Sequence, residues 1–193
     1  TVFANRRFTA GSMAITFAFF ALMGFVFVIT QYFQFVRDYG TLEAGIRTVP
    51  FALFVGVAAP LSERLTARFG SKAIVTTGLV GMAIGFVIAA VTTTVDTPYA
   101  VIVVAMFFMG GGLGLVQAPA TEAIMGSLPP AKAGVGSAVN DTARELGSTL
   151  GVAIVGSVFS SVYASNLGRA LEGTPIPPDA LDLAKDSVGA AEE

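Results

Sequence analysis

Three charged residues, Asp141, Arg144 and Glu145, interrupt a long apolar stretch in the last third of the chain. At about 100° per residue of an α-helix, they share an arc of roughly 140° with nearby polar residues. These neighbours are Ser137, Asn140 and Ser148, and the opposite side consists of Val, Ala, Leu and Ile. A polar face at membrane depth has to meet protein or a water-filled cavity rather than lipid.

Two interpretations of this charged face are open. Asp141 and Arg144 lie three residues apart, a spacing that allows a structural ion pair. Glu145 then carries a surplus negative charge, and Glu122 upstream could add another. Because desolvation and a like charge nearby both favour the protonated form of a carboxyl group, the surplus acid could instead exchange protons. The sequence therefore predicts proton-coupling candidates at Asp141, Glu145 and Glu122, with Arg144 as charge partner.

Three glutamines are further polar residues in apolar stretches: Gln31, Gln34 and Gln117. Glutamines between membrane helices act as interhelical hydrogen-bonding groups or as substrate ligands, and both roles are open here. Together with the three polar neighbours on the charged face, they are the candidates for lining a cavity.

The composition indicates an integral membrane protein. Of the 193 residues, 54% are hydrophobic and 12% are charged, compared with roughly 25% charged in a soluble domain. The sequence contains no His and no Cys, which excludes disulfides, Cys/His zinc sites and His-activated nucleophiles. We therefore expect no cofactor, no metal site and no enzymatic activity. The net charge of −2 provides no basic field for nucleic acid.

Uncharged runs predict five transmembrane helices, because a span needs about 20 largely apolar residues. The predicted helices cover residues 8–36, 43–66, 72–94, 98–128 and 134–163. Continuous Ala/Gly-rich runs are unlike the alternating ten-residue strands of an outer-membrane barrel. We expect an all-α membrane protein in which residues 1–165 form the transmembrane bundle and residues 166–193 form a polar loop.

Basic residues gather on one predicted side of the membrane: Arg6, Arg7, Arg64, Arg68, Lys72 and Lys132. Positively charged loops remain in the cytoplasm, which predicts a cytoplasmic N-terminus and an external C-terminal tail. We therefore expect a multi-pass protein of the plasma (inner) membrane, with the lipid bilayer as its surroundings. Glycines four residues apart, at 81/85, 110/114 and 147/151, predict close helix packing or seams along which helices rock.

Several motifs resemble the major facilitator superfamily. Arg68, Gly70 and Lys72 match the Arg-x-Gly-x-Arg/Lys core of its cytoplasmic loop. The segment 133–157 resembles the penultimate helix of the fourteen-helix drug:proton antiporters, and residues 117–129 resemble the helix before it. The resemblance implies five helices of a C-terminal bundle that lacks its last helix, with the missing N-terminal half of the same transporter as a partner.

The resemblance also implies a function: part of a proton-coupled multidrug or small-amphiphile exporter that works by alternating access. Family members that export organic cations carry acids at the positions of Glu145 and Asp141. They often have an uncharged residue where this chain has Arg144, so the charge of the substrate stays open. The expected partners are a small-molecule substrate and protons. The alternatives are export of an endogenous lipid or metabolite, and a non-functional transporter fragment.

Overall fold

The computed structural model describes residues 2–170. Over this range the chain forms five long helices and no strand, and each helix is long and apolar enough to cross a membrane. The predicted all-α membrane architecture is confirmed. The helices are α1 (Arg6–Gln31), α2 (Thr41–Phe69), α3 (Ser71–Thr92), α4 (Tyr99–Met125) and α5 (Ala133–Ala170).

Local sequence explains several helix ends. The side chain of Asn5 caps α1 by accepting a hydrogen bond from the backbone N–H of Arg7 at 3.0 Å. Beyond Gln31 the helix continues as a π-helical turn, Tyr32–Val36. Gly70 separates α2 from α3 with a φ of 83°, in the left-handed region that favours glycine.

The helix α5 is longer than the sequence indicated. The sequence predicts a helix over 134–163 and a polar loop from residue 166, whereas the observed helix runs through Ala170. Arg169 donates a hydrogen bond to the Asn166 side chain at 2.9 Å, a local contact that stabilises the last turn. No proline occurs in this region before Pro175, so polarity alone does not end the helix. The remainder of the predicted loop, 171–193, lies outside the described residues.

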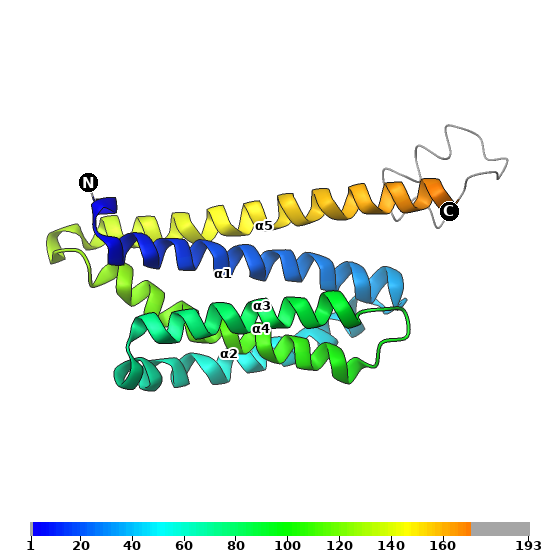
Figure 1. Ribbon diagram of the computed structural model, residues 1–193, viewed down its shortest axis with the longest axis horizontal. Helices are drawn as coiled ribbons and strands as arrows, with labels where there is room; N and C mark the ends of the chain where they lie inside the picture. The colour runs from blue at the N-terminus through cyan, green and yellow to red at the C-terminus, as the bar shows by residue number, and fades with distance from the viewer. Residues whose placement is uncertain (1, 171–193) are drawn as a thin grey trace.

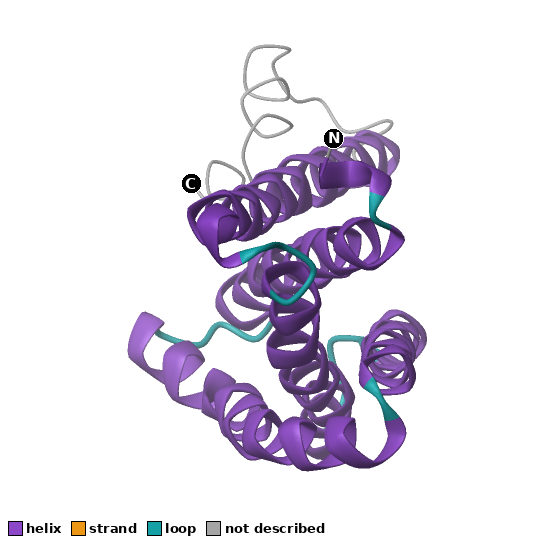
Figure 2. Ribbon diagram, turned by 90° about the vertical axis from the view of Figure 1, so that its left-hand side faces the viewer, coloured by secondary structure: helices purple, strands orange, loops and turns teal. Residues whose placement is uncertain are grey.

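The helix α4 lies at the centre of the bundle. It packs against α1, α2 and α3, whereas α5 packs mainly along α1 and only slightly against α4 (Figures 1 and 2). Figure 1 shows α5 running beside α1 over its whole length and projecting past it. The order in space is therefore α5, α1, α4, with α2 and α3 flanking α4.

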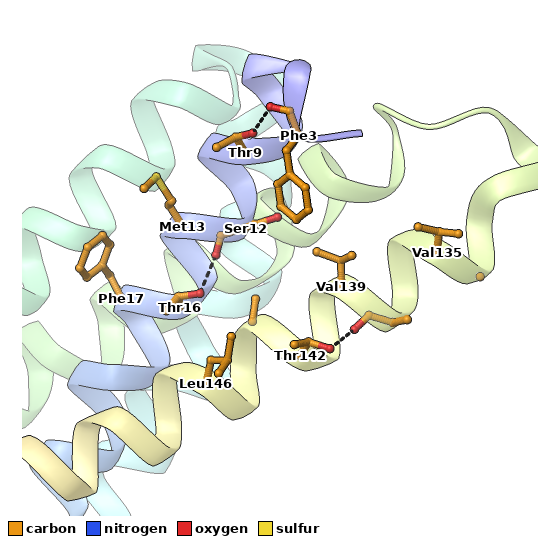
Figure 3. A pocket seen from close by; sticks show the side chains of 13 residues that line it. Phe3, Thr9, Ser12, Met13, Thr16, Phe17, Val135, Val139, Thr142 and Leu146 are labelled. Carbon is orange, nitrogen blue, oxygen red and sulfur yellow. Dashed lines mark hydrogen bonds between the residues drawn. The ribbon is translucent and has the colours of Figure 1, made fainter. Parts of the chain in front are cut away.

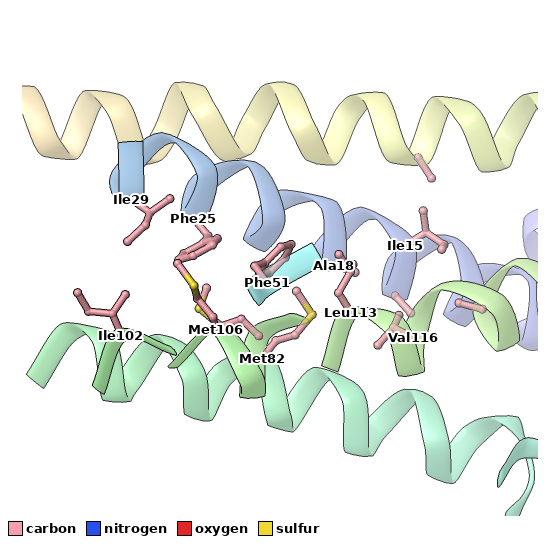
Figure 4. Close-up of a cluster of buried hydrophobic side chains, with 14 of the residues drawn as sticks. Ile15, Ala18, Phe25, Ile29, Phe51, Met82, Ile102, Met106, Leu113 and Val116 are labelled. Atoms are coloured by element: carbon pink, nitrogen blue, oxygen red, sulfur yellow. The ribbon is translucent and has the colours of Figure 1, made fainter. Parts of the chain in front are cut away.

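The apolar core fills the space between the first four helices. Phe25 of α1, Phe51 of α2, Met82 of α3 and Met106 of α4 point toward one another there (Figure 4). The rings of Phe25 and Phe51 lie 5.2 Å apart between centroids. The flexible methionines fill the irregular gaps that the rings leave.

Glycines allow the close helix contacts that their spacing predicted. A Cβ added at Gly110 or Gly114 would lie 2.6 or 2.8 Å from backbone oxygens of α2. A Cβ at Gly147 or Gly151 would collide with backbone oxygens of α1. In the third predicted pair, only Gly85 makes so close a contact. Backbone therefore meets backbone both between α4 and α2 and between α5 and α1.

The two ends of the bundle differ in character. At one end the start of α1 meets the α4–α5 connection, where Asn5 Nδ2 donates to the Ser127 carbonyl at 3.5 Å. The α2–α3 turn lies at the same end, which we call the basic end because it collects six cations. These are Arg6, Arg7, Arg64, Arg68, Lys72 and Lys132.

Tyrosine and arginine side chains tie the helices together at the opposite end. Tyr32 donates a hydrogen bond to the Thr94 carbonyl at 2.9 Å, and Tyr99 donates to the Arg47 carbonyl at 2.8 Å. The Arg47 guanidinium carbon lies 4.2 Å from the ring centroid of Tyr39. These contacts join the α1–α2 connection, the start of α2 and the α3–α4 connection into one closed end.

Candidate functional site

The polar side of α5 meets α4 and α1 in the first half of α5. Thr121 donates a hydrogen bond to Asn140 Oδ1 at 3.2 Å, and Arg144 donates to Thr121 Oγ1 at 3.4 Å. The guanidinium carbon of Arg144 also lies 5.1 Å from the ring centroid of Phe19. Asn140 is buried and Arg144 is half-buried. We call these four side chains, from three helices, the polar node.

The polar node leaves one donor without a partner. Arg144 Nε is buried and makes no hydrogen bond within the described part of the chain. Its neighbours supply one long hydrogen bond and the face of an aromatic ring, both of which fall short of a carboxylate partner. The node therefore holds a cation whose hydrogen-bonding capacity is only partly used.

The two acids of α5 lie outside the polar node. Asp141 and Glu145 are both exposed. The ion pair that the spacing of Asp141 and Arg144 allows is not formed: among residues 2–170, the one ion pair within 4.0 Å joins Glu43 and Arg47. Arg144 turns instead toward α1 and α4, where it meets an aromatic ring and a hydroxyl. Arg144 therefore faces the neighbouring helices α1 and α4, whereas Asp141 and Glu145 are exposed.

The other polar candidates are spread around this region. Ser137 is exposed and Ser148 is half-buried, both on α5. Gln117 is half-buried on α4, one helical turn before Thr121, and so lies on the same side of that helix. Glu122 is exposed near the C-terminal end of α4. Among the described residues, no group of three His, Cys, Asp or Glu side chains could hold a metal ion.

Two of the predicted cavity residues lie elsewhere. Gln31 ends α1 and Gln34 belongs to the π-helical turn, and both are half-buried. At about 1.5 Å per residue, Gln31 is roughly 18 Å along α1 from Phe19. The structure therefore does not bring these two glutamines together with the polar node.

The predicted cytoplasmic-loop motif forms the turn between α2 and α3. Gly70 makes the turn itself, and Arg68 and Lys72 are exposed on either side of it. The guanidinium carbon of Arg68 lies 5.3 Å from the ring centroid of Phe69. The motif thus contributes two cations to the basic end and lies apart from the acids of α5.

A pocket of about 710 Å³ opens between α1 and α5 near the basic end (Figure 3). Its polar lining consists of hydroxyl groups from Thr9, Ser12, Thr16 and Thr142. Each hydroxyl donates to a carbonyl of its own helix or the preceding turn, at 2.7 to 3.0 Å. No charged residue lines this pocket. It is an apolar surface distinct from the polar node.

Sequence reasoning missed two members of the node, Phe19 and Thr121. Thr121 carries a usable signal, because it follows Gln117 by one helical turn and so extends a polar stripe on an otherwise apolar helix. Phe19 carries none, because it is one of 16 phenylalanines in the chain. Only the crossing of α1 with α5 places its ring beside Arg144.

Comparison with known proteins gives one family and a consistent set of relatives. Residues 1–152 match the family model of the Major Facilitator Superfamily. The chain is 32% identical over 190 residues to the multidrug efflux pump LfrA of Mycolicibacterium smegmatis, covering 98% of this chain and 37% of that protein.

Two further relatives have similar coverage. The methylenomycin A resistance protein of Streptomyces coelicolor is 32% identical over 171 residues, which are 88% of this chain and 36% of that protein. The riboflavin transporter RibZ of Clostridioides difficile is 30% identical over 166 residues, which are 86% of this chain and 35% of that protein. The chain spans about a third of the length of each of these relatives.

Proposed function

Because the chain belongs to the major facilitator superfamily, we propose that it is part of a proton-coupled exporter of small amphipathic molecules. The resemblance drawn from its motifs is confirmed at the level of the superfamily, and its relatives include a multidrug efflux pump and an antibiotic resistance protein. The observation that carries the proposal is the exposed pair of acids on α5, Asp141 and Glu145, inside a helix that is apolar enough to cross a membrane.

The charge arrangement supports exchange of a proton for a substrate. Two ionised carboxylates at membrane depth require water or another protein surface. Since Arg144 is turned toward α1 and α4, it does not pair with Asp141 within the described structure. A proton or a cationic substrate can each neutralise the acids, and competition between the two is the linkage that an antiporter requires. Because neither Asp141 nor Glu145 forms an ion pair with Arg144 in the described structure, we assign the exchanging proton to these two acids together.

Alternating access supplies the rest of the mechanism. In transporters of this kind, bundles rock about a site near the middle of the membrane, and ligands favour different facing states. The backbone contacts of Gly147 and Gly151 hold α5 against α1, so the acids move as one body with α1. The wall that faces these acids would come from protein beyond the residues 2–170 described here.

Efflux measurements on the intact protein test the proposal. Everted vesicles carrying Glu145→Gln should lose proton-driven transport of a fluorescent lipophilic cation, while the amount of inserted protein stays unchanged. Asp141→Asn should weaken transport, and Ser160→Ala, an exposed position further along α5, is the matched control. Normal transport against a gradient by both acid variants at every pH tested would place the proton site elsewhere and overturn the assignment.

Orientation is the second part of the proposal. The six cations of the basic end favour a cytoplasmic location for that end in the plasma (inner) membrane. Single cysteines introduced at Ser71, the first residue of α3, and at Asp96, in the α3–α4 connection, should differ in labelling by a membrane-impermeant maleimide in intact cells. Labelling of the Asp96→Cys variant alone supports the orientation, and labelling of the Ser71→Cys variant alone reverses it.

A second candidate function is export of an endogenous metabolite. The specific observation is the 30% identity to a relative named as a riboflavin transporter, which is close to the identity with the drug pump. The same scaffold serves many substrates, so fold alone does not choose between them. Transport of radiolabelled riboflavin and of a lipophilic cation, each measured in vesicles with the unmodified protein and with the Glu145→Gln variant, distinguishes the two. The substrate is the compound whose proton-driven transport the Glu145→Gln variant loses.

A further inference from the structure

A proline divides α4 into two parts that pack most closely against different helices. Pro119 lies inside the helix, and its side chain is fully buried. Before this proline, Gly110 and Gly114 face α2, and Gly112 faces α3. A Cβ added at any of these glycines would collide with a backbone oxygen of the facing helix. Residues 99–118 therefore pack, backbone against backbone, on α2 and α3.

The part of α4 after the proline has other partners. The carbonyl oxygen of Ala120 would lie 2.9 Å from a Cβ added at Gly11 of α1. Thr121 donates a hydrogen bond to Asn140 Oδ1 of α5 at 3.2 Å. Figure 1 shows this end of α4 rising away from α2 toward the starts of α1 and α5. The closest contacts of α4 thus change at Pro119, from α2 and α3 to α1 and α5.

Two groups of helices follow from these contacts. The α1–α5 group consists of α1, α5 and residues 120–132, and the α2–α3 group consists of α2, α3 and residues 99–118. In the middle of the bundle the groups meet through side chains, among them Phe25 of α1, Met82 of α3 and Met106 of α4 (Figure 4). Methionine side chains adapt readily to changes of shape. The contact between the groups is therefore softer than the glycine contacts within each group.

Hydrogen bonds join the two groups at the end of the bundle opposite the basic end. Tyr32 donates to the Thr94 carbonyl at 2.9 Å, and the Arg37 guanidinium donates to the Val95 carbonyl. Both donors follow α1, and both acceptors belong to the α3–α4 connection. Pro119 lies in the last turns of α4, toward the basic end. A tilt of one group against the other is therefore opposed at the hydrogen-bonded end and meets least resistance at the basic end.

The chemistry of proline makes bending easy at this point. Pro119 has no N–H, so the Leu115 carbonyl one turn earlier lacks its helical hydrogen bond. A change of bend here breaks no backbone hydrogen bond, because the bond that would oppose it is already missing. Residues 2–170 bury the proline ring completely, so a helix that packs on the outside of this bundle does not contact it.

We propose that Pro119 is a hinge about which the α1–α5 group, with Asp141 and Glu145, tilts against the α2–α3 group. The inference rests on the proposed function in one respect, since it makes this tilt the step that moves the two acids during transport. It adds a motion inside the bundle to the rocking of whole bundles. A hinge needs only a few residues that absorb a change of angle, and Pro119 lies where the partners of α4 change.

Distances between spin labels on the intact protein, with any other cysteines replaced, test the hinge. Cysteines at Arg68 and Lys132 place one label on each group at the basic end, where both positions are exposed. Cysteines at Arg7 and Lys132 place both labels on the α1–α5 group. We expect more than one distance population for the first pair and one population for the second. Pro119→Ala should restore the helical hydrogen bond and reduce the first pair to a single population.

Pro60→Ala is the matched control. Pro60 also lies inside a helix, but Val57 before it and Leu61 after it line the same groove with α3 and α4, so α2 keeps its partners there. This variant should leave both distance distributions unchanged, and thermal denaturation checks that every variant is folded. A single population for the Arg68 and Lys132 pair in the unmodified protein would overturn the hinge. An unchanged distribution in Pro119→Ala, or equal narrowing by Pro60→Ala, would overturn it as well.

Transport measurements separate the hinge from the proton site. Pro119→Ala should slow proton-driven efflux of a lipophilic cation at least about three-fold, because conformational steps of this kind often limit turnover. Full-rate efflux by Pro119→Ala, with loss of efflux in Glu145→Gln, would overturn the role of the hinge in transport and leave the proton site in place. Normal efflux by both acid variants would overturn the proposed function, while the spin-label distances would still decide whether the hinge exists.

Discussion

The helices α4 and α5 are both apolar enough to cross a membrane, yet they are held in very different ways. Half of an 18-residue apolar stretch of α4 is buried inside the bundle, whereas 11% of the corresponding stretch of α5 is buried. α4 is surrounded by three helices, whereas α5 rests along one. The charges follow the same division, since α4 carries only Glu122, near its end, and α5 carries Asp141, Arg144 and Glu145 in its first half.

This difference shows how a helix bundle can keep charged side chains inside a membrane. A charged side chain on a helix surrounded by apolar neighbours has no water and no partner, at a cost of several kcal/mol. A helix held on one side only can turn its ions toward a cavity or another protein surface. The glycine seam with α1 makes this arrangement stable, because it needs only a narrow strip of α5 for packing.

The largest effect is expected in the close contact between α3 and α4. A Cβ at Gly78 of α3 would lie 2.6 Å from the carbonyl oxygen of Gly112 and 2.7 Å from Val116 Cγ2. Gly78→Val should therefore abolish recovery of monodisperse protein, because overpacking costs about 1–3 kcal/mol or more when backbone cannot move. Gly111→Val is the control, since nothing lies within 4 Å of its added Cβ, and it should purify normally. Comparable yields of both variants would contradict the packing argument.

A smaller and local effect is expected at the α5 seam. Gly147→Val should push α5 away from α1, because a side chain there collides with the Thr16 carbonyl, while α1 to α4 remain folded. Limited proteolysis should then cut the α4–α5 connection faster. Gly156→Val, where only the ring of Phe27 lies near the added Cβ at 3.6 Å, is the control on the same helix. Complete loss of folded protein in the Gly147 variant would mean that α5 is no less essential to the bundle than α4.

Sequence reasoning succeeded for the helices and for the glycine contacts between them, and it failed for the contacts of the charged side chains. The five spans follow from uncharged runs, because the bilayer imposes their length directly. The ion pair between Asp141 and Arg144, one of the two interpretations that the sequence left open, is absent from the described structure because residue spacing shows only that a pair can form. The direction of the Arg144 side chain is decided by Phe19 and Thr121, which come from other helices. No local sequence pattern encodes which side chains of neighbouring helices meet.

The polar node should contribute modestly to stability. Thr121→Val removes the hydrogen bonds with Asn140 and Arg144, and interhelical hydrogen bonds in membranes average about 0.6 kcal/mol with a maximum near 1.7. We expect a loss of this order in the free energy of unfolding, measured by denaturation in mixed micelles. Thr142→Val is the control, because that hydroxyl bonds only to its own helix at Ala138, and its effect should stay within about 0.5 kcal/mol. Equal losses would remove the node as a link between α4 and α5.

The smallest effect is expected at the one acid of α4. Glu122 is exposed near the helix end, and its side chain makes no hydrogen bond or ion pair with the described residues. Glu122→Gln should therefore change the free energy of unfolding by less than about 0.5 kcal/mol. If α5 alone carries the coupling acids, as proposed, proton-driven efflux by this variant should equal that of the unmodified protein, while Glu145→Gln abolishes it under the same conditions. Loss of efflux in the Glu122 variant with normal efflux in the Glu145 variant would move the coupling site to α4. The contrast between α4 and α5 would then no longer hold, because the proton-coupling carboxylate would lie on α4, the helix that is buried in the bundle.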